Sequence, residues 1–278
     1  MTEERTTRAL LVVSFGTSVV QAGKKTIDRI EEELGSSFSG FRIYRAWTSR
    51  VIIEKLKKRD GIRIPTVQEA LGQMLAEGIR ELVVQPTHLM DGIENERMKR
   101  DVEAYADRFS TLAFGEPLLA GERRETVIKA VTEAVMAEFG DPGGDGALVF
   151  MGHGTPHDAR TVYAELDAAF KEMGYENVFL ATVEEGLSVG AVEKRLKHMG
   201  KKRVILAPFM LVAGTHALQD MAGADGNSWK SRFEAAGFSV TCVMKGLGEY
   251  PGIRRLYTAH ARAAEKRLSR TGTGSMAV

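Results

Sequence analysis

Short apolar runs alternate with helical patterns along most of the chain. The runs have the length and bounding turn residues of strands, and they cover residues 9–15, 41–46, 81–84, 147–151, 178–183 and 203–208. Apolar residues recur at helical spacing over residues 24–34, 51–56, 66–77 and, near the end of the chain, 252–268. Strands that alternate with helices predict an α/β fold with mostly parallel sheets.

One βα pattern is used twice in this sequence. Setting Gly16-Thr17 against Gly154-Thr155 aligns residues 10–15 with residues 148–153 and places Phe15 opposite His153. A second stretch, residues 78–86, aligns with residues 200–208, and this register sets Glu94 opposite His216. The match of residues 46–49 with residues 181–184 is weaker but keeps the order.

The repeat predicts two similar βα domains. The densest cluster of turn formers covers residues 140–146, and the second copy starts directly after it. We therefore predict one domain over residues 1–139 and another over residues 140–278, with the final helix packed across one of them.

Composition excludes several classes of protein. The 278 residues suffice for a packed core, and 44% apolar with 27% charged residues is typical of a folded, water-exposed chain. A net charge of +1 without basic blocks argues against nucleic acid as a partner, and no apolar run is long enough for a membrane helix. The first residues do not form a secretory signal, so we expect a cytoplasmic protein. The single cysteine, Cys242, excludes an internal disulfide and is expected to be a structural thiol.

Three strand-like runs of the second half end in side chains that can bind a metal. His153 follows the first run, Glu184 and Glu185 follow the second, and His216 follows the third. The carboxyl ends of parallel strands open on one crevice, so two imidazoles and one carboxylate are expected to meet there. Either glutamate could be the one that points inward.

Each of these residues also has an ordinary structural interpretation. His153, flanked by glycines, could bond a backbone carbonyl in a tight turn, His216 could lie in a surface loop, and the glutamates could begin a helix. The common position at strand ends favours the metal site. An open site of two histidines and a carboxylate suits Co, Ni, Fe or Zn, and no CxxC or HExxH pattern indicates a closed zinc site.

The remaining histidines carry weaker signals. His198 and His260 fall in helical stretches and are expected to be structural, whereas His157 could cap a helix or line a pocket. His88 follows the strand-like run 81–84 in the first half, so it could line a ligand cleft or serve the fold. The turn after residue 14 lacks a nucleotide-binding pattern, and nucleotide binding is discounted.

Several segments of the chain match, in order, the motifs of one known enzyme family. They are Leu11-Val-Val-Ser-Phe-Gly-Thr-Ser18, Lys57-Lys-Arg-Asp-Gly61, Val84-Gln-Pro-Thr-His88, Phe150-Met-Gly-His-Gly-Thr155, Ala181-Thr-Val-Glu184, Pro208-Phe-Met-Leu-Val-Ala-Gly214, Asp220-Met-Ala-Gly223 and Ser228-Trp-Lys230. With these segments the chain resembles the anaerobic sirohydrochlorin-type (class II) cobaltochelatases of cobalamin biosynthesis, and the likeness runs from about Leu10 to Tyr257.

The resemblance implies a bilobal chelatase-like fold that holds a tetrapyrrole in a cleft between two domains. It implies insertion of Co²⁺ into sirohydrochlorin to give cobalt-sirohydrochlorin, without ATP and without a cofactor beyond the substrate metal ion. Carried over by position, the metal ligands are His153, Glu184 and His216. As a hypothesis of mechanism, we expect His153 and His216 to be the catalytic imidazoles, because an imidazole is the natural acceptor for the protons that leave the macrocycle. The family often has an acid directly before the second histidine, where this chain has Thr215.

Two alternative functions remain open at this stage. The residues that bind the acid groups of the substrate are also open. A chelatase of the same fold could prefer Fe²⁺ or Ni²⁺, since the same ligands accept all three ions. A metal or tetrapyrrole carrier without turnover is the other possibility, and a homo-oligomer is possible in each case. Arg45, Arg50 and Arg97 are candidates for the substrate carboxylates by position only.

Overall fold

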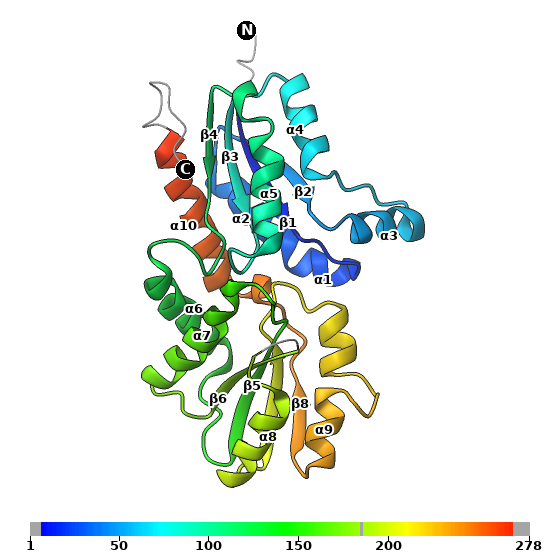
Figure 1. Ribbon diagram of the computed structural model, residues 1–278, viewed down its shortest axis with the longest axis vertical. Helices are drawn as coiled ribbons and strands as arrows, with labels where there is room; N and C mark the ends of the chain where they lie inside the picture. Colours follow the sequence, from blue (N-terminus) through cyan, green and yellow to red (C-terminus); the bar gives the residue numbers. More distant parts are fainter. Residues whose placement is uncertain (1–6, 184–185, 269–278) are drawn as a thin grey trace. The chain divides into compact units, whose positions relative to one another are not determined.

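The structure, a computed structural model, describes residues 7–183 and 186–268. In this part of the chain the strands form two four-stranded sheets, parallel throughout, with the orders β2-β1-β3-β4 and β6-β5-β7-β8 (Figure 1). The strands are β1 (Arg8–Ser14), β2 (Arg42–Trp47), β3 (Glu81–Pro86), β4 (Thr111–Phe114), β5 (Gly146–Gly152), β6 (Val178–Thr182), β7 (Arg203–Pro208) and β8 (Ser239–Cys242). The predicted α/β fold with two similar parallel modules is confirmed.

Helices connect the strands in both modules. The α-helices are α1 (Val20–Lys25), α2 (Ile27–Ser37), α3 (Arg50–Asp60), α4 (Val67–Ala76), α5 (Ile93–Glu103), α6 (Arg124–Phe139), α7 (Thr161–Glu172), α8 (Val189–His198), α9 (Trp229–Ala235) and α10 (Pro251–Leu268). Short helical turns are η1 (Ala106–Arg108), η2 (Asp158–Arg160), η3 (Ala217–Met221) and η4 (Leu247–Glu249).

The two sheets share one register, which is the structural form of the internal repeat. Equivalent residues of the two central strands, β1 and β5, have equivalent partners on both sides: Val13 pairs with Ala46 and Pro86, and Met151 pairs with Ala181 and Pro208. The three stretches aligned from sequence are therefore in a single consistent register. Residues that follow these strands occupy equivalent places in the two copies.

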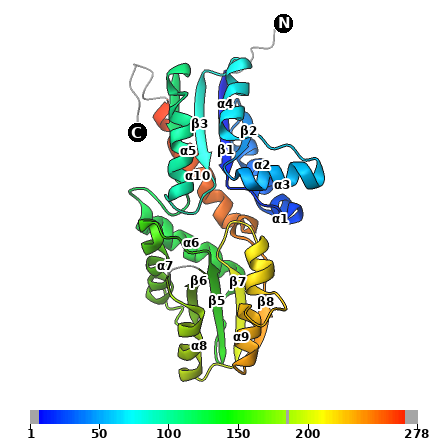
Figure 2. The same cartoon turned by 45° about the vertical axis from the view of Figure 1, so that its right-hand side comes forward.

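Each sheet is buried by helices on both faces, as its almost entirely apolar central strands require. Helices α8 and α9 flank the second sheet (Figure 2). On one of its faces they bury Val192, Leu196 and Phe233 against β5, β6 and β7. On the matching face of the first sheet, α4 and α5 bury Leu71 and Met98. These cores fix the strand ends from which the candidate site projects.

The chain divides into two compact units that exchange a helix. The first unit holds residues up to Ser18, Ile27–Glu122 and the chain from Arg254 onward, and the second holds Val19–Thr26 and Arg123–Ile253. Helix α6 follows β4 of the first sheet but belongs to the second unit, whereas most of α10 follows β8 and belongs to the first. The sequence-based division at residues 139 and 140 differs from these units because a helical pattern does not indicate which sheet the helix covers.

The predicted helix over residues 24–34 is wrong in one respect, since the structure has two helices there. Thr26 ends α1 with φ −123° and ψ −77°, and its hydroxyl donates to the carbonyl of Ala22 at 2.7 Å. Such a threonine hydroxyl bond to the preceding turn competes with helix continuation. The predicted strand over residues 9–15 ends one residue early, and Phe15 stands 46% exposed after it.

Candidate metal site

The central strand of the second sheet, β5, ends at the point where the chain changes direction across the sheet. Strand β6 lies on one side of β5 and β7 on the other, so this is the topological switch point where open α/β sheets bind ligands. Beyond the strands, Val183 N donates to Gly152 O at 3.0 Å and Phe209 N donates to Met151 O at 2.8 Å. The segments that lead to all three predicted metal ligands are thus bonded to the end of β5 or follow directly from it.

His153 projects from this strand end because its two neighbours have no side chains. A Cβ on Gly152 would lie 2.6 Å from Tyr163 Cε1, and Gly154 has a positive φ of 85°. Gly154 N also donates to the Tyr163 hydroxyl at 3.3 Å. Tyr163 therefore packs under the turn, and the imidazole of His153 is exposed above it.

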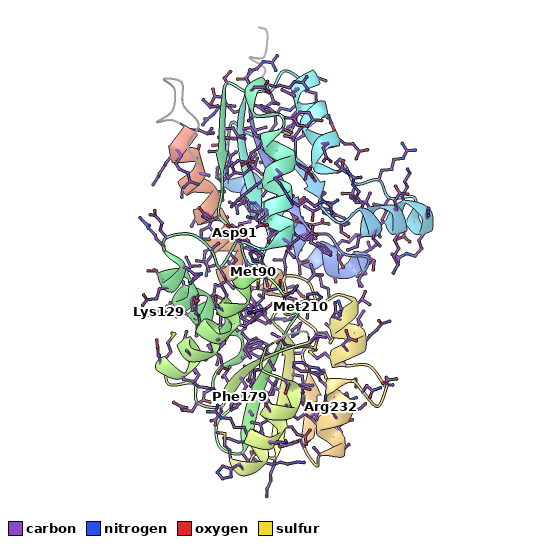
Figure 3. All side chains as sticks on the ribbon, in the orientation of Figure 1. Met90, Asp91, Lys129, Phe179, Met210 and Arg232 are labelled. Atoms are coloured by element: carbon purple, nitrogen blue, oxygen red, sulfur yellow. The ribbon has the colours of Figure 1, made fainter. Side chains whose placement is uncertain are left out.

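His216 follows a loop that is fixed by a backbone hydrogen bond and by buried residues. The loop begins at Phe209, and the carbonyl of the next residue, Met210, which is labelled in Figure 3, accepts from Leu247 N at 2.8 Å. Directly after His216 comes η3, a π-helical turn, and its first and last residues, Ala217 and Met221, are fully buried in the core. These anchors leave His216 on the exposed side of the turn.

The structure brings the two predicted histidines together. Their ring centroids are 4.6 Å apart with an interplanar angle of 68°. Two imidazoles that bind one ion at the usual nitrogen–metal distance of about 2.1 Å have ring centroids about 4.6 Å apart at a right angle and about 5.3 Å apart at a tetrahedral angle, so this separation suits a shared metal ion.

A carboxylate contacts the second histidine and was not predicted from sequence. Asp220 Oδ2 lies 2.6 Å from His216 Nδ1, and the side chains are 44% and 47% exposed respectively. The signal in the sequence is the i, i+4 spacing of the two residues, which places them on one face of a helical turn. The sequence allowed a surface loop at His216 and did not predict the helical turn that follows it.

The third predicted ligand, Glu184, and its neighbour Glu185 lie outside the described residues. Glu184 follows directly after Val183, whose amide is bonded to the residue before His153. Across residues 7–183 and 186–268, no three His, Cys, Asp or Glu side chains gather closely enough to hold a metal ion. Of the three predicted ligands, the described residues thus contain the two histidines alone.

The equivalent strand ends of the first unit carry a different set of side chains. Phe15 takes the place of His153, and Glu94, in the first turn of α5, takes the place of His216. His88 is held as a structural residue would be: its carbonyl accepts from Leu118 N at 3.0 Å, and its Nδ1 lies 3.3 Å from Asn95 Oδ1. Its Nε2 is buried and has no hydrogen-bond partner among the described residues.

Two of the other histidines contact the backbone, as predicted for His260. His260 Nδ1 lies 3.1 Å from the carbonyl of Glu116, and His198 is exposed at the end of α8. His157 Nδ1 accepts from Ala159 N at 3.1 Å, which is the capping alternative. Cys242 packs against the core of the second sheet, and burial raises the pKa of its thiol.

Arg45 does not serve as a free carboxylate-binding group. Its Nε donates to both carboxylate oxygens of Glu31 at 2.8 and 2.9 Å, and the guanidinium also bonds Asp28. The candidate assignment of Arg45 is therefore corrected to an internal ion pair. Arg50 and Arg97 are exposed.

We expect the free energy of unfolding to fall as the pH decreases below about 6.5, because two buried histidines resist protonation. Burial lowers the pKa of His88 and that of His260. Below the pKa of an unfolded histidine, the unfolded chain binds protons that the folded chain does not. Each such residue removes up to about 1.4 kcal/mol per pH unit until the pH reaches its lowered folded-state pKa.

Urea unfolding between about pH 7.5 and pH 5.5 measures this effect in the unmodified chain and in H88Q and H260Q. Each variant should show a shallower loss of stability across this range, since it removes one group that titrates only in the unfolded chain. A slope in H88Q equal to that of the unmodified chain would show that His88 binds protons equally in the folded and unfolded chain, so that burial does not lower its pKa.

Among the helices of the described residues, none is both long and apolar enough to cross a bilayer.

A family model described as cobalt chelatase (CbiK) matches residues 8–266. The chain is 38% identical over 257 residues to the sirohydrochlorin cobaltochelatase of Salmonella typhimurium, covering 92% of this chain and 96% of that protein.

A second relative and a solved structure extend the comparison. The sirohydrochlorin cobaltochelatase CbiKC of Nitratidesulfovibrio vulgaris is 34% identical over 269 residues, which cover 95% of this chain and 92% of that protein. The structure of SirB from Bacillus subtilis with Fe³⁺ superposes with a TM-score of 0.65 at 16% identity, covering 94% of this chain and 98% of that one. At this identity the structural likeness concerns the fold alone.

Proposed function

Because the chain belongs to the cobalt chelatase family, we propose that it inserts Co²⁺ into sirohydrochlorin to give cobalt-sirohydrochlorin, in anaerobic cobalamin biosynthesis and without ATP. The names of both curated relatives support the substrate and the metal. The observation that carries the proposal is the pair of imidazoles, His153 and His216, at 4.6 Å on the ligand-binding edge of the second sheet.

We assign metal binding to His153, Glu184 and His216. Two imidazoles and a carboxylate provide three ligands and leave coordination positions open, as an ion in transit requires. A closed site with four protein ligands would hold the ion too firmly for transfer. Co²⁺ is a substrate of this reaction, and it enters the macrocycle without a change of oxidation state.

The same imidazoles can account for the protons. Two pyrrole N–H protons must leave the macrocycle as Co²⁺ enters it. An imidazole nitrogen that binds the ion has no free lone pair, but it regains one when the ion moves to the pyrrole nitrogens. His153 and His216 thus become bases at the moment when protons are released, and an imidazole titrates near neutral pH.

The substrate's carboxylates and the setting of the protein belong to the same proposal. Arg50 and Arg97 are exposed and can form charge-assisted hydrogen bonds with acid groups of the tetrapyrrole. A cytoplasmic location and the absence of a nucleic-acid partner remain predictions from the sequence.

An anaerobic insertion assay tests the function. Purified protein is mixed with an excess of sirohydrochlorin and with Co²⁺, Fe²⁺ or Ni²⁺ in parallel, and the absorption change of metal insertion is followed over many turnovers. We expect catalytic turnover that is fastest with Co²⁺. Fastest turnover with Fe²⁺ or Ni²⁺ would assign a different product, since the same ligands bind all three ions. Stoichiometric binding at the uncatalysed rate would replace the enzyme by a carrier.

A further inference from the structure

We propose that Asp220 is a positioning residue for His216: its carboxylate holds the proton on Nδ1 and so presents Nε2 to the metal ion. The inference rests on the proposed metal site, and it adds a residue outside the three assigned ligands. It follows from the contact of 2.6 Å between Asp220 Oδ2 and His216 Nδ1.

The geometry of η3 fixes this contact. Ala217 and Met221, four residues apart, are fully buried, and the residue before each of them is on the exposed side. His216 and Asp220 therefore share a face of the turn for the same reason that Ala217 and Met221 share the opposite one. Single π-helical turns are uncommon and are often found at functional sites.

Backbone contacts fix the residues that follow Asp220 at the end of the turn. Gly223 N donates to the carbonyl of Gln219 at 3.1 Å, and a Cβ on Gly223 would lie 2.3 Å from that carbonyl oxygen. The carbonyl of Gly223 in turn accepts from the hydroxyl of Ser228 at 2.7 Å. Asp220 therefore stands on a rigid support, although its side chain is partly exposed.

The chemistry of the pair sets the tautomer of the histidine. A neutral imidazole carries one N–H, and an ionised carboxylate can only accept a hydrogen bond, so the proton must reside on Nδ1. The lone pair is then on Nε2, the atom free to bind an ion. Hydrogen bonding to a carboxylate also makes the imidazole a stronger ligand. The residue before His216 is Thr215, which has no carboxylate. The carboxylate that contacts the imidazole of His216 belongs to Asp220, in the turn after it.

The experiment measures Co²⁺ affinity without the tetrapyrrole, by competition with a chromophoric chelator. We expect D220A to bind Co²⁺ about 10–100-fold more weakly, the usual effect of losing such a partner. D220N retains an oxygen that can accept from Nδ1, so it should lose less. A ¹⁵N NMR spectrum of the imidazoles, recorded without metal, should show the Nδ1–H tautomer of His216 in the unmodified chain and a shift toward the other tautomer in D220A.

A matched control is E193A, which breaks another i, i+4 pair in the same unit, Glu193 with Lys197 on α8. It should keep both the Co²⁺ affinity and the His216 spectrum. In an H216A background, D220A should cause no further loss, because its effect acts through the ring that has been removed.

Comparing H216A with D220A separates the proposed metal site from the proposed role of Asp220. If H216A binds Co²⁺ as tightly as the unmodified chain, the proposed metal site itself is wrong. If H216A loses affinity while D220A keeps both the affinity and the Nδ1–H tautomer, the metal site stands and the role of Asp220 is overturned.

Discussion

Replacing His153 with Ala is expected to abolish cobalt insertion and to leave the fold intact. The imidazole is exposed beyond the end of β5, and the turn beneath it is held by Gly152, Gly154 and Tyr163. Truncating an exposed side chain away from the core usually changes stability by about 0.5 kcal/mol or less. The loss of a metal ligand that also accepts a proton should lower kcat by a factor of about 100 or more.

The insertion assay with sirohydrochlorin and Co²⁺ measures kcat, and urea unfolding measures stability. The matched control is H198A, which removes another exposed imidazole of the second unit, at the end of α8 and thus before the start of β7 rather than after its carboxyl end. It should retain full activity. Normal turnover by H153A would remove His153 from the mechanism, whereas loss of the fold would show that the imidazole has a structural function.

A methyl group at Gly246 is expected to destabilise the second unit by about 3 kcal/mol, the upper part of the usual range for overpacking. The Cβ of an alanine there would lie 2.5 Å from the carbonyl oxygen of Leu211 and 2.8 Å from both Val212 Cα and Ala213 N. All three atoms are backbone, so no side-chain rotation relieves the contact. The loop that leads to His216 must shift.

This shift should also reduce insertion, since it moves one imidazole relative to the other. The backbone bonds of Leu247 and Gly248 to residues 210 and 211 tie the two segments together and transmit the displacement. Urea unfolding of G246A and its kcat provide the measurements.

Gly72 offers a contrasting position for the same substitution. It lies inside α4 and a Cβ there would meet nothing within 4 Å, so G72A should be more stable by about 0.5–1 kcal/mol. Stability of G246A equal to that of the unmodified chain would show that the segment of residues 211–213 is not tightly held.

Much of the second unit's site could be predicted from sequence because it depends on strand ends. Apolar runs identify buried parallel strands, and such strands end on one edge of the sheet, so the positions of His153 and His216 followed from pattern alone. The internal repeat added the register, since a slip of one residue would have broken the match of Pro86 with Pro208. The choice of Glu184 over Glu185 as the metal ligand came only from the family resemblance.

Other features could not be predicted, for identifiable reasons. The edge strands β4 and β8 have four residues each and mix polar with apolar side chains, so they give no clear periodic signal. Asp220 acts through a π-helical turn that no simple periodicity indicates. The break at Thr26 depends on a hydroxyl bond, whereas the apolar spacing continues across it.

The exchange of α6 and α10 bears on how the chain can fold during synthesis. The part of α10 from Arg254 onward completes the first unit: Tyr257 is fully buried and donates to the carbonyl of Thr87 at 2.7 Å, and Arg254 pairs with Glu33 at 2.9 Å. The first unit therefore receives this helix only after residues 123–253 of the second unit have been synthesised. Until then one face of the first unit's sheet lacks that helix. The order in which the two units are synthesised is therefore not the order in which they can be completed.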